Sequence, residues 1–185
     1  MGNTPRRFNL VEEAWIPAVD IGQVSLRQIF SDPELRALGG NPIQKISVMK
    51  LLLAIGQAAC TPQDDEEWKA LGADGLARKA LAYLEENKDL FWLYGESPFL
   101  QMPDIHKAKV QGFGAVVADM VSGNTTVLLQ SHSERELTDG EKALQLVVLG
   151  SCALGGKKTD NTVVLTAGYA GKPNAKAKPS TAKPG

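Results

Sequence analysis

The chain has 185 residues and a mass of 19.8 kDa, with 43% hydrophobic and 22% charged residues. This composition excludes a disordered, collagen-like or coiled-coil protein, and the length allows one domain that buries about 70% of the unfolded chain's surface. The net charge of −1 hides an asymmetry, because residues 157–185 hold six lysines and one aspartate (+5) and the rest of the chain carries −6. The basic end could meet a polyanion that the rest would repel.

The first thirty residues predict short strands separated by turn residues. We expect strands at residues 8–11, 15–19 and 24–26, with a turn at 20–23, in the form of a small meander or hairpin. The sequence Ser31-Asp32-Pro33 then predicts a short helix that ends at Gly39 and Gly40.

The strongest helix start follows at Asn41, which is a suitable N-cap, with Pro42 at the first helical position and Gln44 closing a capping box. The helix is predicted to run to about Ala59. Its apolar residues recur with the 3.6-residue period, so we expect them to form the buried stripe: Ile43, Ile46, Met49, Leu52, Leu53 and Ala59.

Three further helices are predicted along the chain. The start signal at residues 61–64 precedes four carboxylates at 64–67, and we interpret them as helix capping at the positive end of the helix dipole rather than as a metal or acid–base site. After Gly72 and Gly75, an amphipathic helix is expected over residues 76–87. A capping box at Thr138-Asp139-Gly140-Glu141 predicts a largely buried helix through Leu154.

The aromatic stretch at residues 89–94 and the turn at 95–98 allow base stacking, but core packing is the commoner use of such side chains. Strands are expected at 125–129 and 162–166, and a polar loop at 130–136. The pattern as a whole predicts an α+β fold of mixed helices with short, mainly antiparallel strands.

No pattern of catalytic or metal-ligating residues emerges. The two histidines, His106 and His132, lack the context of a hydrolase motif. Cys60 and Cys152 lie 92 positions apart in apolar stretches that read as helix, which favours buried free thiols over a disulfide or metal pair. The glycines at 150–159 resemble a phosphate-binding loop, but an extra glycine intervenes and a helix stop is favoured. We expect neither metal nor cofactor.

The chain has no apolar leader and no run of 18 apolar residues, so we expect a cytoplasmic protein that does not enter membranes. From Gly171 onward the segment holds three prolines, four lysines and no apolar side chain larger than alanine. It can be a flexible linker or a phosphate-binding segment, and composition favours the linker. Because no closing element follows, we expect the chain to be cut within a loop.

Several blocks of this sequence, in order, carry a family resemblance: FNLVEEAWIPAV, VSLRQIF, LGGNPIQKISVMKLLLAIGQAA, TPQDDEEW and ESPFLQMP. Together they resemble the N-terminal part of the CasA-type large subunit of Cascade, the type I-E CRISPR surveillance complex. The resemblance runs from about Phe8 to the last residue.

This resemblance implies a non-catalytic subunit that sits with other Cascade proteins and the crRNA. It implies recognition of the short motif (PAM) that flanks a target in double-stranded DNA, help in opening the duplex, and recruitment of a separate helicase-nuclease. The family has an α/β N-terminal domain and a C-terminal four-helix bundle. Residues 1–170 would belong to the N-terminal domain and 171–185 to a flexible Lys/Pro/Gly-rich loop, and the bundle and the motif-reading residues would be absent.

The resemblance also implies two nucleic-acid-binding loops. The family's flexible loop near the crRNA end and target DNA corresponds to Leu129, Gln130, Ser131 and His132, with the polar residues up to Gly140. Its glycine-rich DNA-contacting loop falls near residues 168–185, where this sequence is less rich in glycine and offers lysines instead. The expected contacts there are Gly171, Lys172, Asn174, Lys176, Lys178 and Lys183.

Three classes of function remain open on the sequence. The leading one is a DNA-binding and assembly subunit without enzymatic activity. The second is a structural interaction fragment that docks on neighbouring subunits without contacting DNA. An enzyme is the least favoured of the three.

Overall fold

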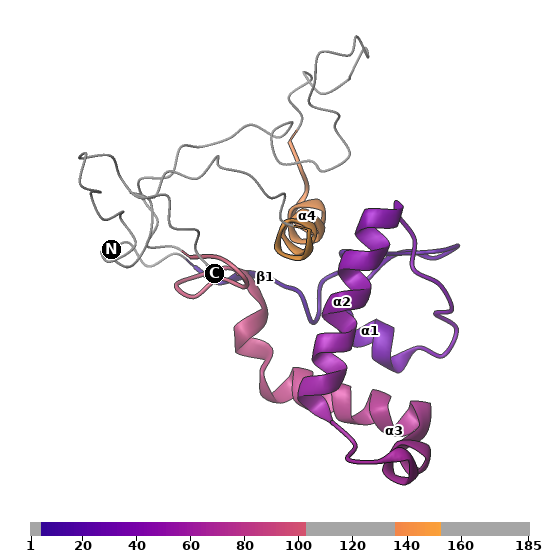
Figure 1. Ribbon diagram of the computed structural model, residues 1–185. Helices are drawn as coiled ribbons and strands as arrows, with labels where there is room; N and C mark the ends of the chain where they lie inside the picture. The colour runs from indigo at the N-terminus through magenta and orange to yellow at the C-terminus, as the bar shows by residue number, and fades with distance from the viewer. Residues whose placement is uncertain (1–4, 103–135, 153–185) are drawn as a thin grey trace, which may run out of the picture.

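The computed structural model describes residues 5–102 and 136–152, which form helices and short paired strands (Figure 1). In chain order the elements are β1 (Arg7–Asn9), β2 (Ile16–Ala18), β3 (Gly22–Val24), α1 (Leu26–Ser31), α2 (Pro42–Ala59), α3 (Asp65–Glu86), the 3-10 helix η1 (Lys88–Phe91), β4 (Trp92–Tyr94) and α4 (Asp139–Ser151). Both strand pairs are antiparallel, which confirms the α+β prediction for this part of the chain.

The strands form two separate pairs rather than one meander. The hairpin of β2 and β3 is confirmed, with Ile16 opposite Val24. The first strand instead pairs with β4, where Arg7 lies opposite Tyr94. The reason is local, because the Asn9 side chain accepts a hydrogen bond from the Val11 backbone N–H at 3.0 Å, so residues after Asn9 turn instead of extending the strand.

Helix α1 begins at Leu26, five residues before the predicted start at Ser31, and ends where that helix was expected to begin. Ser25 is its N-cap, and Gln28 closes a capping box with it. The predicted strand at 24–26 is correct only at Val24, since the strand is Gly22–Val24, and the predicted helix from 31 to 39 is wrong. The segment after α1 runs beside the hairpin, where the Gly39 backbone N–H donates to the Pro17 carbonyl at 2.8 Å.

Helix α2 has the predicted start and end, but it buries a different face. Asn41 and Gln44 form the capping box. The fully buried residues of α2 are Ser47, Val48, Ile55 and Gly56. Small side chains let the neighbouring helices approach, since Ser47 Oγ lies 3.6 Å from Cys152 Sγ after α4 and Gly56 faces Leu76 of α3. The predicted stripe is wrong at Ile46, Met49 and Leu53, which are exposed, whereas Leu52 and Ala59 are partly buried against the core.

Helix α3 starts as the carboxylate run predicts. The Asp64 side chain caps the helix by accepting a hydrogen bond from the Glu67 N–H at 2.8 Å, and the next three carboxylates occupy the first turn. The helix is broken at Gly72, with φ 58° and ψ −179°, so a second helical segment follows as expected. In α4, the Thr138–Glu141 capping box is confirmed and the helix ends at Ser151.

The core joins the hairpin, α1, α2, α3 and α4 around Trp15, whose indole N–H donates to the Leu10 carbonyl at 2.9 Å. Phe91 and Phe99 stack with centroids 5.3 Å apart, so the aromatic stretch does contribute to the core. Cys60 and Cys152 are free thiols, but each is only half-buried and caps a helix end, so the prediction of buried helical cysteines is wrong. No helix in the described ranges has the length and apolar character of a membrane span.

Candidate functional site

The ten residues predicted by number to contact nucleic acid fall in neither described range. These are Leu129, Gln130, Ser131, His132, Gly171, Lys172, Asn174, Lys176, Lys178 and Lys183. The same holds for His106 and for the strands expected at 125–129 and 162–166. The position of these residues in the fold stays a prediction. The end of the first predicted loop does lie in a described range, and there Asp139 and Gly140 belong to the first turn of α4 and not to a loop.

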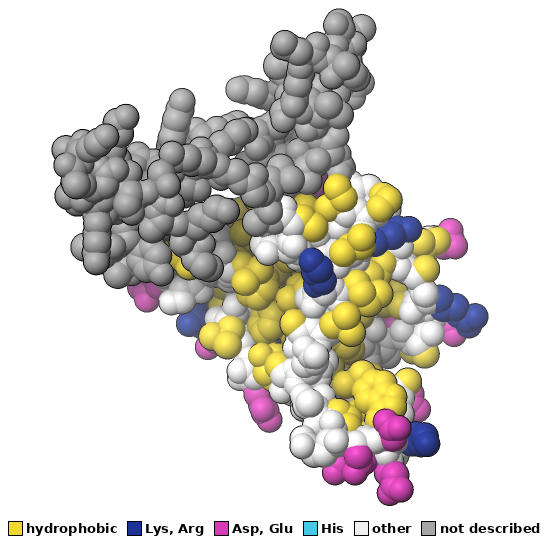
Figure 2. Space-filling view, viewed as in Figure 1, with side chains coloured by type: hydrophobic (Ala, Val, Ile, Leu, Met, Phe, Trp, Pro, Cys, Tyr) yellow, Lys and Arg dark blue, Asp and Glu magenta, His cyan; other side chains and the backbone are white. Residues whose placement is uncertain are grey.

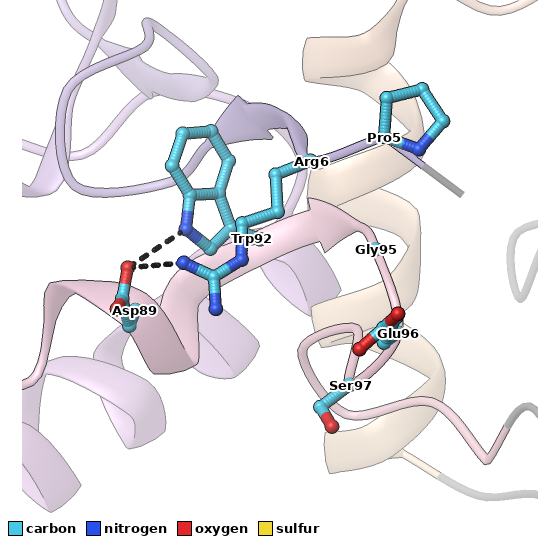
Figure 3. Close-up of a pocket in the computed structure, with 7 residues that line it drawn as sticks. All are labelled: Pro5, Arg6, Asp89, Trp92, Gly95, Glu96 and Ser97. Carbon is cyan, nitrogen blue, oxygen red and sulfur yellow. Dashed lines mark hydrogen bonds and ion pairs between the residues drawn. The ribbon is translucent and has the colours of Figure 1, made fainter. Parts of the chain in front are cut away.

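One open pocket of about 540 Å³ lies where β1 meets β4 and the turn that follows it (Figure 3). Its lining comes from the start of the chain, from η1 and β4, and from the turn: Pro5, Arg6, Asp89, Trp92, Gly95, Glu96 and Ser97. The β1–β4 pairing, which brings residues about 85 positions apart together, creates this pocket.

Arg6 and Asp89, two of the three charged residues that line this pocket, are paired with each other. Arg6 Nη1 lies 2.8 Å from Asp89 Oδ1, and the same oxygen accepts a hydrogen bond from the Trp92 indole at 3.3 Å. Two hydrogen bonds lower the pKa of the Asp89 carboxyl below its usual value. The one from the Trp92 indole N–H has the larger effect, and the one from the Arg6 guanidinium has the smaller. A carboxylate that is already paired and has a lowered pKa is a poor general base, and with Glu96 the lining carries two anions and one cation, which disfavours phosphate.

A second charged cluster ties the turn after β1 to α1, α3 and η1. Glu12 Oε1 lies 2.7 Å from Arg27 Nη2 and 2.8 Å from Lys88 Nζ, and Arg27 also pairs with Glu85. Hydrogen bonds from Arg27 and Lys88 lower the pKa of Glu12 to about 2. Because every member has an oppositely charged partner within the protein, this cluster stabilises the fold rather than forming a ligand site.

A third cluster fastens α4 to the β1–β4 pair. The Arg7 guanidinium carbon lies 4.1 Å from the centre of the Tyr94 ring and the guanidinium also pairs with Asp139, at the start of α4. The Tyr94 hydroxyl donates to Asp139 Oδ1 at 2.8 Å. These contacts fix the first turn of α4 against the strands, although most of the intervening chain lies outside the described ranges.

The most unusual surface feature is the outer face of α2 (Figure 2). Ile46, Met49 and Leu53 are 54%, 48% and 60% exposed, and Met49 also lines a groove of about 180 Å³ beside the helix. The other residues of this groove are Ala18, Ile29, Leu35, Arg36, Ala37, Leu38 and Leu52. The 3.6-residue period predicted that the side chains of Ile46, Met49 and Leu53 are buried. The sequence signal that this prediction did not use is that α2 contains no carboxylate, so its exposed face has no acidic side chain.

Within residues 5–102 and 136–152, no group of three or more histidine, cysteine or acidic side chains could hold a metal ion. Both histidines of the chain lie outside these ranges. The described surface includes the polar pocket beside β1 and β4 and the apolar face of α2, both of which can contact other molecules.

Comparison with known proteins gives the context of this surface. Residues 9–177 match the family described as CRISPR-associated protein Cse1. The chain is 29% identical over 167 residues to the CRISPR-associated protein CasA/Cse1 of Thermus thermophilus, covering 81% of this chain and 32% of that protein.

Solved structures agree with the sequence match. The crystal structure of Thermobifida fusca Cse1 is 30% identical, with a TM-score of 0.63 over 76% of this chain and 29% of that one. A chain of a structure titled CRISPR RNA-guided surveillance complex has the same fold, with a TM-score of 0.60 and 18% identity over 78% of this chain and 34% of that one. This chain thus spans about a third of the length of these relatives. The match over residues 9–177 shows that the chain belongs to the Cse1 family, the CasA-type large subunits, as the sequence blocks indicated.

Proposed function

We propose that this chain is part of a non-catalytic DNA-binding and assembly subunit of a crRNA-guided surveillance complex in the cytoplasm. The observation that carries the proposal is the family match over residues 9–177, which reaches into the basic segment that starts at Gly171. In the same proposal, the whole subunit takes part in recognising the PAM, in opening the duplex and in recruiting the helicase-nuclease. Its partners are the other Cascade proteins, the crRNA and target double-stranded DNA.

Charge supports a division of labour within the chain. Residues 1–156 carry a net charge of −6, so this larger part would repel a phosphate backbone, whereas residues 157–185 carry +5. We propose that residues 1–170 belong to the N-terminal domain and that the loop at 171–185 follows the DNA backbone through its lysines. Lysines act as point charges toward phosphates, so such contacts position the protein without reading sequence.

The salt dependence of DNA binding tests this proposal. If Lys172, Lys176, Lys178 and Lys183 each neutralise one phosphate, the loop contributes about −3.6 to the slope of log affinity against log salt. We expect the fourfold alanine variant to lose that contribution when duplex binding is measured by fluorescence anisotropy across a salt series.

A matched variant controls for the loss of charge alone. Lys45, Lys69, Lys79 and Lys142 are four exposed lysines on the described helices, and changing them to alanine removes the same formal charge. This variant should keep the parent slope. An unchanged slope in the loop variant would leave residues 171–185 as a linker.

The alternative function is a structural interaction fragment that docks on neighbouring subunits without contacting DNA. The exposed apolar face of α2 favours it, because three large apolar side chains close together in water are typical of a protein contact. The salt experiment separates the two functions, since only the DNA-binding subunit shows a lysine-dependent slope.

A further inference from the structure

The outer face of α2 has a pattern of apolar and charged residues that fits one kind of partner. Ile46, Met49 and Leu53 follow i, i+3 and i+7 spacing, so they form one stripe along about 10 Å of the helix. In the same view as Figure 1, Figure 2 shows hydrophobic side chains running along the face of α2, while acidic ones gather at the lower end over α3. Met49 belongs to the stripe and also lines the groove beside α2, so the stripe and the groove are continuous.

The charges on this face are mainly positive, and the carboxylate of Glu34 pairs with Arg36 at 3.5 Å. Lys45 and Lys50 are exposed and stand roughly 140° apart around the helix axis, with the stripe between them. Arg36 lies at the groove. No carboxylate occurs in the sequence from Arg36 to Gln63, although the chain as a whole has a net charge of −1. This is a local cationic frame around an apolar centre on an otherwise acidic body.

We propose that this stripe and groove are a docking surface for an acidic amphipathic helix of another protein. Such a helix places an apolar face on the stripe and its Asp or Glu residues beside Lys45 and Lys50, as in helix-in-groove recognition. Lys50 Nζ donates to the Ser151 carbonyl at 3.1 Å, and its other two N–H groups can reach a carboxylate. The charge pattern sets specificity and orientation, while the apolar side chains supply most of the affinity. The proposal concerns a protein partner and does not depend on the proposed DNA binding.

Charge also disfavours the other candidate occupants. A second copy of this chain docked through the same face would bring the lysines of both copies together, because a two-fold contact uses the same patch twice. The basic segment at 157–185 carries +5 and would meet cationic side chains as well. An acidic partner is the one that complements the face.

A designed peptide serves as the probe. We would use a helical peptide of roughly 20 residues with leucines at i, i+3, i+4 and i+7 and glutamates beside them, labelled for anisotropy, with the full 185-residue chain. Its counterpart has lysine in place of every glutamate. The acidic peptide is expected to bind at least about tenfold more tightly than the basic one.

Two matched substitutions locate the binding. Leu53→Glu places a carboxylate in the stripe and should weaken binding of the acidic peptide at least about tenfold. Leu90 is equally exposed, at 59% against 60%, but lies on η1, so Leu90→Glu should leave the affinity unchanged. Lys45→Glu should reduce the preference for the acidic over the basic peptide.

Other results would overturn the proposal. Dissociation constants weaker than about 1 mM for both peptides, or equal loss of binding in Leu53→Glu and Leu90→Glu, would exclude the docking surface. A melting temperature lowered in Leu53→Glu but not in Leu90→Glu would mean that the chain itself covers the face. Concentration-dependent dimerisation that Leu53→Glu abolishes would mean that a second copy occupies it. None of these results bears on the salt slope of DNA binding.

Discussion

At the scale of single residues, the described part of the chain uses charge to join segments that are distant in sequence. Glu12 bridges Arg27 and Lys88, and Arg27 also reaches Glu85. Because the guanidinium and ammonium groups hydrogen-bond to the carboxylate, the folded state keeps Glu12 ionised at a lower pH than the unfolded chain does. The cluster therefore makes stability depend on pH.

Replacing Glu12 by glutamine should lower the free energy of unfolding at pH 7 by about 1 kcal/mol, a value reduced for solvent screening because the carboxylate is 36% exposed. The folded-state pKa is lowered from 4.5 to about 2, so the contribution of the ionised carboxylate is complete above pH 4.5 and is lost as the pH falls toward 2. Urea unfolding of both proteins between pH 7 and pH 2 measures this.

The difference between parent and Glu12→Gln should shrink steadily through that acid range. The exposed neighbour Glu13 supplies the control, and Glu13→Gln should match the parent at pH 7 within about 0.5 kcal/mol. A gap between parent and Glu12→Gln that widens on acidification would contradict the assigned role of the carboxylate.

At the scale of elements, the sequence predicted what is encoded locally. The capping boxes at Asn41 and Thr138 place a side-chain acceptor three residues before its backbone donor, so the starts of α2 and α4 can be read without the rest of the chain. The same signal stands at Ser25 and Gln28, but treating residues 24–26 as strand concealed it. Which face of α2 is buried depends on tertiary packing. The apolar period of the helix sequence therefore predicted burial for a face that is exposed.

The break in α3 predicts opposite effects of one substitution at two glycines. Gly72 has φ 58° and ψ −179°, a conformation costly for any residue with a Cβ, so Gly72→Ala should destabilise the protein by about 1–3 kcal/mol although nothing lies within 4 Å of the added atom. Gly56 lies inside α2, where an added Cβ would make an ordinary contact of 3.8 Å with Leu76.

For Gly56→Ala we therefore expect a gain of about 0.5–1 kcal/mol from the better helix propensity of alanine. Thermal and denaturant unfolding of both variants measure the two signs. Stabilisation by Gly72→Ala would show that the break in α3 is not maintained in solution.

At the scale of the whole molecule, α4 completes the core from a distance. Its buried residues Ala143, Leu144 and Val147 join the hydrophobic core and α4 lies against α2, although residues 103–135 precede it in the chain. The pairing of β1 with β4 is equally non-local. Pairings of this kind depend on global shape complementarity, so the sequence alone did not predict them, and the ten predicted nucleic-acid contacts likewise stay predictions because they lie beyond the described ranges.

The docking of α4 can be tested with one substitution at two positions. Leu144 is 6% exposed and Leu149 is 40% exposed on the same helix, so changing each to alanine alters helix propensity equally. Leu144→Ala should lower the free energy of unfolding by about 2–5 kcal/mol, as expected when a buried leucine leaves a cavity. For Leu149→Ala the loss should be smaller than about 1 kcal/mol. Equal losses would mean that α4 does not pack as described.

The union of β1 with β4 also has a consequence for biosynthesis. The first strand leaves the ribosome with its backbone N–H and C=O groups unmatched and has to wait for Tyr94 before its register with Arg7 can form. At typical translation rates of about 5–20 residues per second, the roughly 85 residues between the partners take about 4–17 s to synthesise. During that interval the brevity of the strand and the charge of Arg7 protect the nascent polypeptide from pairing with a neighbouring chain.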